Sequence, residues 1–553
     1  MFLDDKIYMG LDGDGNRVNL ELSMANRHGL IAGATGTGKT ISMKCMAESF
    51  ADAGVPVFLC DVKGDVSGIC EPGEQNEGME KRIDRFGIRD SFSYKGYTTT
   101  FWDIYGEKGH PIRATVSDMG PELLARILNL TEAQEGVLNI IFRIADDNGL
   151  LLIDLKDLRA MVNYVGEHKD DYLLEYGNIA KQSLGGIVRA ILPIEDQGGD
   201  KFFGEPDLDI MDWIRTDYNG KGMINVLDAV KLVNNPKLYS IFLLWMMAEL
   251  FENLPEVGDP EKPKLVFFFD EAHFLFTDMP NVFIQKIEQM VKLIRSKGVG
   301  VYFVTQNPAD IPDSVLAQLS NKVQHALRAY TPAEQKAIKA AAQSYRVNPD
   351  FDTEQAITEL GVGEAIVSFL DLEGIPTMVQ KTKIICPQSK MAAAEETTRQ
   401  SMMSQDGMNK YDSMIDNESA FEVLSEQARV SQEQARLDAE REAFEKEKAE
   451  YALAQQKEAE KAEKEAQKAA EKAHKEAVKA QERAEREALK AAEKEQKARA
   501  RQASTAAGSV GGTLGREVGK ALGSTFGSIG KKVGGNLGAT LGRGFFKNLI
   551  GKK

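Results

Sequence analysis

The chain contains 553 residues, 42% of them hydrophobic, and carries a formal net charge of -16. This length predicts two or more domains, and the hydrophobic content is sufficient for a large buried core. Most of the acidic excess lies before residue 390. Such a charge excludes a protein that attracts nucleic acid through its overall field, so any DNA contact would need a locally basic channel or loop.

Four cysteines are present without C-x-x-C spacing: Cys45, Cys60, Cys70 and Cys386. They predict neither a structural zinc site nor a disulfide framework, and they favour a reducing compartment. The start of the chain lacks the basic and apolar regions of a signal peptide, and the apolar run 241–247 is too short to span a bilayer. We therefore expect a cytoplasmic protein.

Weakly alternating apolar residues at 1–26 predict an N-terminal β-hairpin around the Asp/Gly turn at 12–15. The apolar run 28–32 then predicts a buried strand, followed by a G-x-x-x-x-G-K-[ST] phosphate loop and a helix over 41–53. Its glycines allow successive backbone N–H groups to surround phosphates. The residues expected to bind ATP are Gly33, Ala34, Thr35, Gly36, Thr37, Gly38, Lys39 and Thr40.

Within this loop Lys39 is expected to reach the β- and γ-phosphates, and the Thr40 hydroxyl to ligate Mg²⁺. A second strand is predicted at 264–269, and it ends in Asp270 and Glu271, the Walker B pattern. We expect Asp270 to hold Mg²⁺ and Glu271 to act as the general base. Taken alone, this pair would also suit a helix N-cap.

Two further strands are expected to end beside this site. The strand 300–305 precedes Gln306, a candidate for sensing the γ-phosphate or positioning water, although a simple turn before Pro308 would give the same pattern. The strand 55–60 ends in Asp61, which we expect near the nucleotide because ligands bind at the carboxyl ends of strands in doubly wound sheets. His273 either senses the nucleotide or caps the next helix.

The chain between these strands and Walker B is far longer than an α/β connection requires. Apolar residues at helical spacing predict a helical insertion over 71–221, and a strand at 223–227 and a helix over 238–254 return to the core. The predicted fold class is α/β.

The composition changes after residue 390. Residues 391–502 form a segment rich in Ala, Glu, Lys, Gln and Arg, which predicts either a weak coiled coil or an isolated charged helix. Residues 503–553 are basic, with glycine recurring about every fourth residue beside an apolar residue. If helical, this tail would suit helix packing, a protein partner or an anionic membrane surface; otherwise it would be disordered in isolation.

Four segments together resemble the HerA/FtsK branch of P-loop motor ATPases: 28–40, 61–65, 265–273 and 295–308. Shorter phrases at 203–206, 254–259 and 268–273 resemble the bacterial HerA-like family typified by YjgR. The resemblance covers about residues 1–390. It implies a RecA-like P-loop NTPase core at 27–70 and 222–390.

The same resemblance implies a homo-oligomer, typically a hexameric ring, that uses Mg²⁺ and ATP to move on duplex DNA. It also implies an arginine donated by the neighbouring subunit, for which Arg295 is the best match, with Arg328 and Arg27 as alternatives. A second hypothesis is an ATP-switched scaffold that binds partners or a membrane through the C-terminal segments, and a small-molecule kinase is a weaker third.

Overall fold

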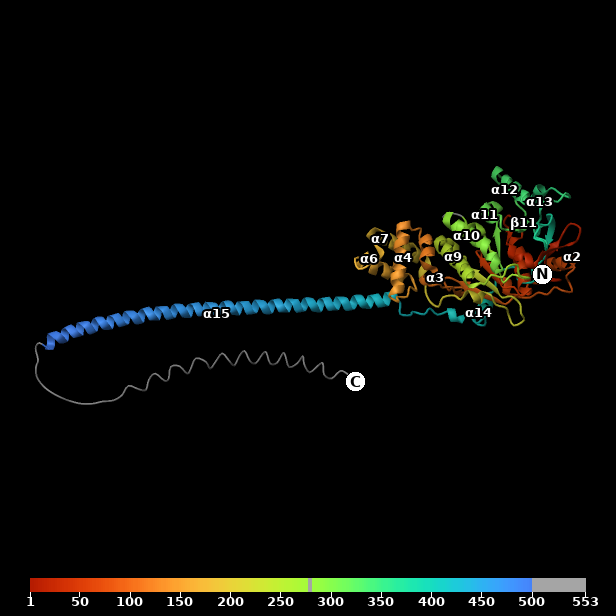
Figure 1. The fold of residues 1–553 in the computed structure, drawn as a ribbon. Helices are drawn as coiled ribbons and strands as arrows, with labels where there is room; N and C mark the ends of the chain where they lie inside the picture. The colour runs from red at the N-terminus through yellow and green to blue at the C-terminus, as the bar shows by residue number, and fades with distance from the viewer. Residues whose placement is uncertain (277–280, 500–553) are drawn as a thin grey trace. The chain divides into compact units, whose positions relative to one another are not determined.

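A mixed sheet with a parallel centre organises the chain in a computed structural model that describes residues 1–276 and 281–499 (Figure 1). Its strands run in the order β1-β2-β13-β12-β11-β4-β10-β9-β5-β8-β6-β7, with β3 pairing β2. Neighbouring strands from β11 to β7 are parallel, and those on the other side of β11 are antiparallel. This confirms the α/β fold class.

The strands are β1 (Phe2–Leu3), β2 (Lys6–Leu11), β3 (Arg17–Glu21), β4 (Gly29–Ala32), β5 (Val57–Asp61), β6 (Thr99–Asp103), β7 (His110–Pro111), β8 (Ile224–Asp228), β9 (Leu265–Phe269), β10 (Val299–Thr305), β11 (Asn321–His325), β12 (Glu364–Ser368) and β13 (Gln380–Ile384). The expected hairpin corresponds to the antiparallel pair β2 and β3.

The helices are α1 (Lys39–Asp52), α2 (Glu77–Arg85), α3 (Val116–Ile127), α4 (Glu132–Asp147), α5 (Leu155–Glu167), α6 (Leu173–Tyr176), α7 (Lys181–Ile194), α8 (Asp200–Phe202), α9 (Pro236–Asn253), α10 (Asn281–Ile294), α11 (Asp313–Leu316), α12 (Pro332–Gln343), α13 (Thr353–Glu359), α14 (Glu396–Met403) and α15 (Ala420–Arg499). Short 3₁₀ turns lie at Leu22–Arg27, Ser67–Cys70, Ile210–Trp213, Leu232–Asn234, Ala272–Leu275, Arg295–Lys297, Pro308–Asp310 and Asn409–Tyr411, and a π turn at Glu195–Gly199.

The central strands are buried on both faces, which explains their almost continuous apolar sequences. Along β9, Phe267 and Phe269 pack into the core that contains α9, whereas Phe268 packs with α1 on the opposite face. Side chains of successive strand residues point to opposite faces, so each strand serves two cores. The Walker B strand is thus fixed in both directions perpendicular to the sheet.

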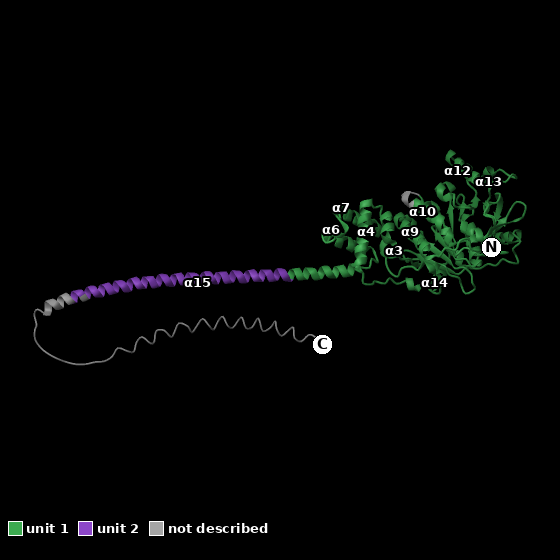
Figure 2. Ribbon diagram, viewed as in Figure 1, with its two compact units in different colours: residues 1–436 green, residues 437–553 purple. Residues whose placement is uncertain are grey.

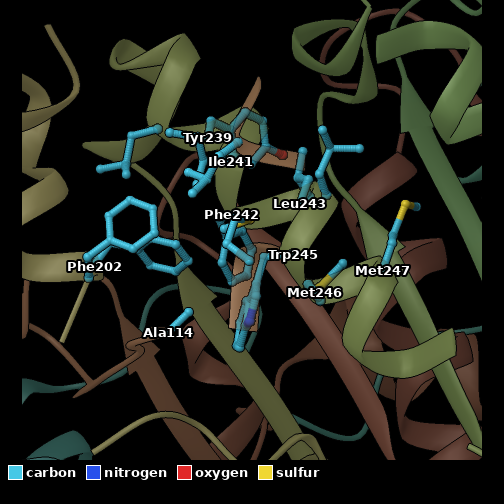
Figure 3. Close-up of a cluster of buried hydrophobic side chains, with 14 of the residues drawn as sticks. Ala114, Phe202, Tyr239, Ile241, Phe242, Leu243, Trp245, Met246 and Met247 are labelled. Carbon is cyan, nitrogen blue, oxygen red and sulfur yellow. The ribbon is translucent and has the colours of Figure 1, made fainter. Parts of the chain in front are cut away.

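Helix α9 is apolar around its whole circumference in its central turns, where residues 238–247 are all buried. Figure 3 shows its side chains within the hydrophobic cluster, where the ring of Phe202 meets those of Phe242 and Trp245 at centroid distances of 6.4 and 5.7 Å. A helix that is hydrophobic on every side belongs between layers rather than on a surface. Helix α9 therefore joins the sheet to the helices that precede it.

The sheet takes in two strands from the range expected to be a helical insertion, 71–221. Strand β6 pairs with β8, and β7 pairs with β6, both in parallel. Helices α3 to α8 occupy only the later part of that range. The sequence Thr-Thr-Phe-Trp-Asp of β6 is fully buried, so its membership of the sheet depends on long-range pairing that helical spacing elsewhere in the range does not reveal. The other domain boundaries remain predictions.

The range 391–502 also begins differently from the expected charged helix. Residues 391–419 contain the short helix α14 and pack on the core. The buried ring of His110 lies 2.6 Å from Asp412 and 3.1 Å from Asp406, and Arg399 stacks over Phe101 at 5.3 Å. Composition alone obscured this segment because its anchoring groups are polar.

The chain divides into two units, residues 1–436 and 437–553 (Figure 2). The described part of the second unit consists of the continuation of α15, whose side chains are exposed. The predictions for the glycine-rich tail at 503–553 lie outside the described residues. Among the helices that the structure describes, none is long and apolar enough to cross a membrane.

Candidate nucleotide-hydrolysis site

The phosphate loop joins the end of β4 to the start of α1. Its Gly33 N–H donates to the Thr305 carbonyl oxygen at 3.2 Å, and its Ala34 N–H donates to the Ala326 carbonyl oxygen at 2.8 Å. Gly33 has a φ of 152°, and a Cβ there would lie 2.5 Å from the Cβ of His325. Only glycine fits this position. The loop is therefore held by the strands on both sides of β4.

Lys39 is buried, and its ammonium group binds the backbone of the phosphate loop itself. It donates to the carbonyl oxygens of Gly33 and Ala34 at 2.7 and 3.2 Å. Burial lowers the pKa of Lys39, although the carboxylates of Glu271 and Asp270 act in the opposite direction. Lys39 thus occupies the centre of the loop, with its charge compensated by carbonyl dipoles and by the two acidic residues of the Walker B strand.

Asp270 is 1% exposed, and neither of its carboxylate oxygens has a hydrogen-bond partner. Burial raises the pKa of Asp270 to about 7, even though Lys63 opposes the shift. A buried carboxylate without partners is costly unless a cation or donor completes it. The chemistry of this side chain fits a role as a ligand, directly or through water, of a hard divalent cation.

Glu271 lies at the centre of a polar chain. Its carboxylate oxygens lie 2.5 Å from the Lys63 ammonium and 3.2 Å from Nδ1 of His273, and each accepts from the Gln306 amide at 3.2 Å. Burial would raise the pKa of Glu271, but the hydrogen bonds from Lys63 and Gln306 outweigh it and hold that pKa below its usual value. Glu271 is therefore poised as an ionised base.

Backbone geometry and the phosphate loop also fix this group. Glu271 has a φ of 47° and a ψ of 50°, a left-handed conformation that costs energy for a residue with a side chain and that accumulates at functional sites. Thr35, an exposed residue of the phosphate loop, donates to the Gln306 side-chain oxygen at 3.3 Å. A continuous path of contacts thus runs from the loop through Gln306 to Glu271 and Lys63.

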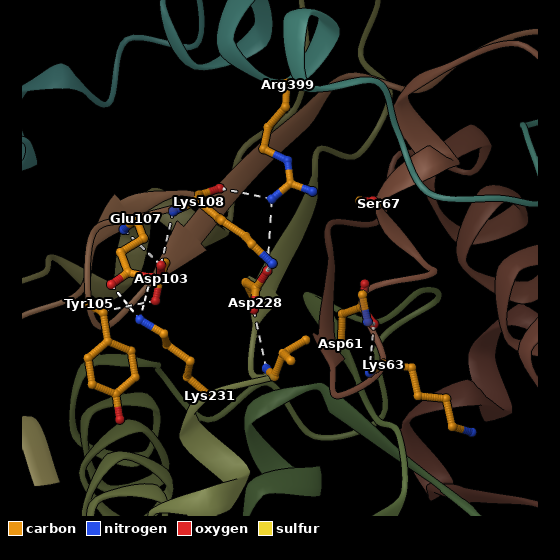
Figure 4. Close-up of polar contacts among 12 residues, drawn as sticks. Asp61, Lys63, Ser67, Asp103, Tyr105, Glu107, Lys108, Asp228, Lys231 and Arg399 are labelled. Carbon is orange, nitrogen blue, oxygen red and sulfur yellow. Dashed lines mark hydrogen bonds and ion pairs between the residues drawn. The ribbon is translucent and has the colours of Figure 1, made fainter.

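Asp61 lies at the same edge of the sheet, but its carboxylate is used within its own loop. It accepts from the backbone N–H groups of Lys63, Gly64 and Val66 at 3.2, 2.7 and 3.0 Å. Burial and the nearby Asp65 raise the pKa of Asp61 to about 6. Figure 4 shows Asp61 and Lys63 in this loop, beside Asp228. Asp61 shapes the loop that presents Lys63, and its expected contact with the nucleotide remains a prediction.

The three candidate arginines lie in two places. Arg295 and Arg27 both bind Asp259, at 3.3 and 3.1 Å, and they precede β10 and β4. They therefore lie at the amino edge of these parallel strands, whereas the phosphate loop follows the carboxyl end of β4. Arg328 donates to the backbone oxygens of Thr358 and Leu360. Neither Arg295 nor Arg27 can belong to the site of its own chain.

Sequence reasoning missed two contributors to this site. Lys63 lacked an assigned role, although β5 pairs directly with β9 and residues that follow neighbouring parallel strands share one edge. His325 was also missed: its Nδ1 lies 2.9 Å from the Glu364 carbonyl oxygen and its Nε2 lies 2.8 Å from the Ser42 hydroxyl. Both residues could have been found only from the order of the strands in the sheet, which cannot be read from the sequence.

A parallel sheet with a phosphate loop, a Walker B carboxylate pair and a polar residue at the tip of the intervening strand defines a P-loop ATPase. The sequence pattern of the family described as "Helicase HerA-like C-terminal" matches residues 7–534. The chain belongs to this family, which confirms the resemblance found in the sequence.

Individual relatives are more distant. The chain is 21% identical over 394 residues to the DNA double-strand break repair helicase HerA of Sulfolobus acidocaldarius, covering 68% of each protein. It is 30% identical over 167 residues to the probable helicase MJECL08 of Methanocaldococcus jannaschii, covering 29% of this chain and 31% of that protein. Among solved structures, plasmid coupling protein TrwB with an ATP analogue aligns at a TM-score of 0.48 with 15% identity, covering 67% of this chain and 88% of TrwB.

Proposed function

We propose that this protein is a motor that hydrolyses Mg-ATP to move on or remodel DNA. The ATPase activity is supported by one observation: Lys39, Asp270 and an ionised Glu271 lie at the same edge of the sheet. Glu271 is held there by contacts with both Lys63 and Gln306. The DNA half is supported by membership of the HerA-like helicase family and by the likeness to a DNA repair helicase.

The residues of the site divide the work of phosphoryl transfer. The backbone N–H groups of the phosphate loop beyond Ala34 and the Lys39 ammonium bind the phosphates, and Thr40 and Asp270 hold the cation. Glu271 accepts a proton from the attacking water. Gln306 orients this base and also binds Thr35 of the phosphate loop. Bound Mg²⁺ would neutralise the charge that develops on the phosphates. Catalysis here is mostly positioning and electrostatic stabilisation.

The cation depends on the nucleotide for most of its ligands. Across the described residues, no three His, Cys, Asp or Glu side chains cluster around a metal position. Mg²⁺ commonly binds through one or two protein ligands together with phosphate oxygens and water. We therefore propose that Mg²⁺ and ATP bind together, through Thr40 and Asp270 on the protein side.

We also propose that the active form is a homo-oligomer in which Arg295 acts on the site of a neighbouring chain. Its position at the amino edge of the sheet supports this assignment, because a group at the edge opposite its own site can act only on the site of another chain. A trans arginine contributes roughly 10³ to 10⁵ in rate in related phosphoryl-transfer systems. The release of Arg295 from Asp259 would be part of assembly.

The test is steady-state ATP hydrolysis by the full chain and its Lys39→Ala variant, with and without long duplex DNA at low salt. Stimulation by DNA that disappears in the variant would support the motor. Turnover in the wild type that ignores DNA would contradict the DNA half and favour an ATP-switched scaffold acting through residues 391–553. Equal turnover in both proteins would contradict the site itself.

A further inference from the structure

Large apolar side chains recur at seven-residue intervals along α15. Val430, Leu437, Phe444 and Tyr451 form this heptad stripe, and they are 54, 53, 67 and 67% exposed. An α-helix has 3.6 residues per turn, so a seven-residue step falls only about 20° short of two turns. The four side chains thus lie along one narrow line of the helix and face solvent.

The stripe has flanks of different charge. Glu433, Glu440 and Glu447 follow the first three stripe residues by three positions, and Gln434, Arg441 and Lys448 follow them by four. Steps of three and four residues place side chains on opposite sides of the starting residue. One flank is therefore acidic, and the other is basic over its last two members.

This arrangement selects a second copy of the chain as the partner. In a parallel pair related by a two-fold axis along the helices, the acidic flank of one helix faces the basic flank of the other. In an antiparallel pair, like flanks would meet. The acidic flank also opposes binding to nucleic acid or anionic lipid, and a line one residue wide is narrower than the apolar face of an interfacial helix.

We propose that α15 pairs in parallel with α15 of a second copy of this chain along the heptad stripe. With one large apolar residue per heptad the pairing is weak and concentration-dependent. The contact Arg441 makes within its own helix, 3.7 Å to Glu445, is exposed on both sides and contributes little, so exchanging it for a contact with the partner is inexpensive. This proposal concerns assembly and does not depend on ATP hydrolysis or DNA binding.

The helix supplies a matched pair of variants. Leu437 on the stripe and Leu453 off the stripe are both 53% exposed, so Leu437→Glu and Leu453→Glu add the same charge at equally exposed positions. In sedimentation measurements on the full chain, we expect Leu437→Glu to raise the dimer dissociation constant roughly tenfold or more, and Leu453→Glu to leave it nearly unchanged. Equal behaviour of the two variants, with helix content by circular dichroism retained, would overturn the proposal.

Cysteine cross-linking tests the orientation. The four natural cysteines are all buried, so a cysteine introduced on the stripe has little competition. Tyr451→Cys should form a disulfide with itself in the full chain, and a mixture of Val430→Cys and Tyr451→Cys should give only the two homodimers. A mixed disulfide between the two variants would show an antiparallel pair and would overturn the parallel arrangement.

Charge exchange gives a rescue. Glu440→Lys with Glu447→Lys makes both flanks basic and should weaken the dimer, and adding Arg441→Glu with Lys448→Glu should restore it. Absence of rescue would contradict pairing of the two flanks. If Leu437→Glu instead abolished binding to anionic vesicles without changing the oligomeric state, the stripe would be a membrane contact and the proposal would be wrong.

Discussion

The Lys63 ammonium lies 2.5 Å from the carboxylate of Glu271, the residue that the Walker B pattern marks as the base. The two groups belong to loops that follow the neighbouring parallel strands β5 and β9. Lys63 is 38% exposed at its side chain, whereas Glu271 is 3% exposed. The base is therefore held from the solvent side by a lysine whose side chain is itself partly exposed.

We predict that Lys63→Ala lowers kcat for ATP hydrolysis about 10- to 100-fold while KM changes little, because the base loses the group that fixes it. Lys63→Arg keeps the charge and should recover part of the rate. A fluorescent nucleotide should bind both variants with nearly wild-type affinity. Weak nucleotide binding by Lys63→Ala would instead identify Lys63 as a contact to the phosphates.

For Asp270, the residue before Glu271, we predict that one substitution raises stability and impairs function. Asp270→Asn removes a buried charge whose carboxylate oxygens accept no hydrogen bond, so at pH 8 without Mg²⁺ the variant should be more stable than wild type, by about 1–3 kcal/mol. Because burial raises the pKa of Asp270 to about 7, the wild-type carboxyl stabilises the fold below its unfolded pKa, and that stability is lost as the pH rises toward 7.

Asp270→Asn should also lose the Mg²⁺ dependence of nucleotide binding. Thermal unfolding at pH 8 and nucleotide titration with and without Mg²⁺ measure the two effects. A destabilised variant would show that Asp270 has a structural partner in the folded state, and the ligand role would then be wrong.

Arg295 gives a prediction about assembly. If Arg295 serves a neighbouring site, Arg295→Ala and Lys39→Ala should each be nearly inactive alone, yet a mixture should recover part of the activity, because some interfaces then combine an intact loop with an intact arginine. Hydrolysis measured across mixing ratios tests this. Arg27→Ala, which alters the other arginine on Asp259, is the control. A mixture with no recovery would contradict the trans role.

We predict that the buried side chain of His28 makes the fold less stable at acidic pH. Its Nδ1 accepts from the Val301 N–H at 3.0 Å and its Nε2 donates to the Val291 carbonyl oxygen at 2.7 Å. Both ring nitrogens are thus hydrogen-bonded when the imidazole is neutral. Burial lowers the pKa of His28 to about 4. A proton on Nδ1 would face an N–H donor. Protonation is therefore disfavoured in the folded state.

Because the folded pKa is depressed, this contribution to stability is present above the unfolded pKa of about 6.5 and is lost as the pH falls toward 4. The loss amounts to about 3 kcal/mol for a single group. Urea unfolding at several pH values should show this slope in the wild type and a shallower one in His28→Gln, a variant without a titrating ring. Equal slopes would assign the acid sensitivity to other groups.

The phosphate loop, the Walker B pair and the α/β class were all predictable from the sequence alone. These features are local: strand, loop and helix follow one another, and glycine and lysine occupy positions that only a phosphate loop requires. The positions of Lys39, Asp270, Glu271 and Gln306 at one edge follow from the same rule, since ligands gather at the carboxyl ends of parallel strands. The family resemblance was also carried by short contiguous phrases.

Which groups act on one another depends on the three-dimensional arrangement of the strands and loops. The order of the strands brought Lys63 to Glu271 and placed β6 in the sheet. The polar anchors of residues 391–419 likewise became visible only in contact with the core. Such relationships join residues far apart in the chain, and neither periodicity nor composition encodes them, because both describe a residue through its sequence neighbours.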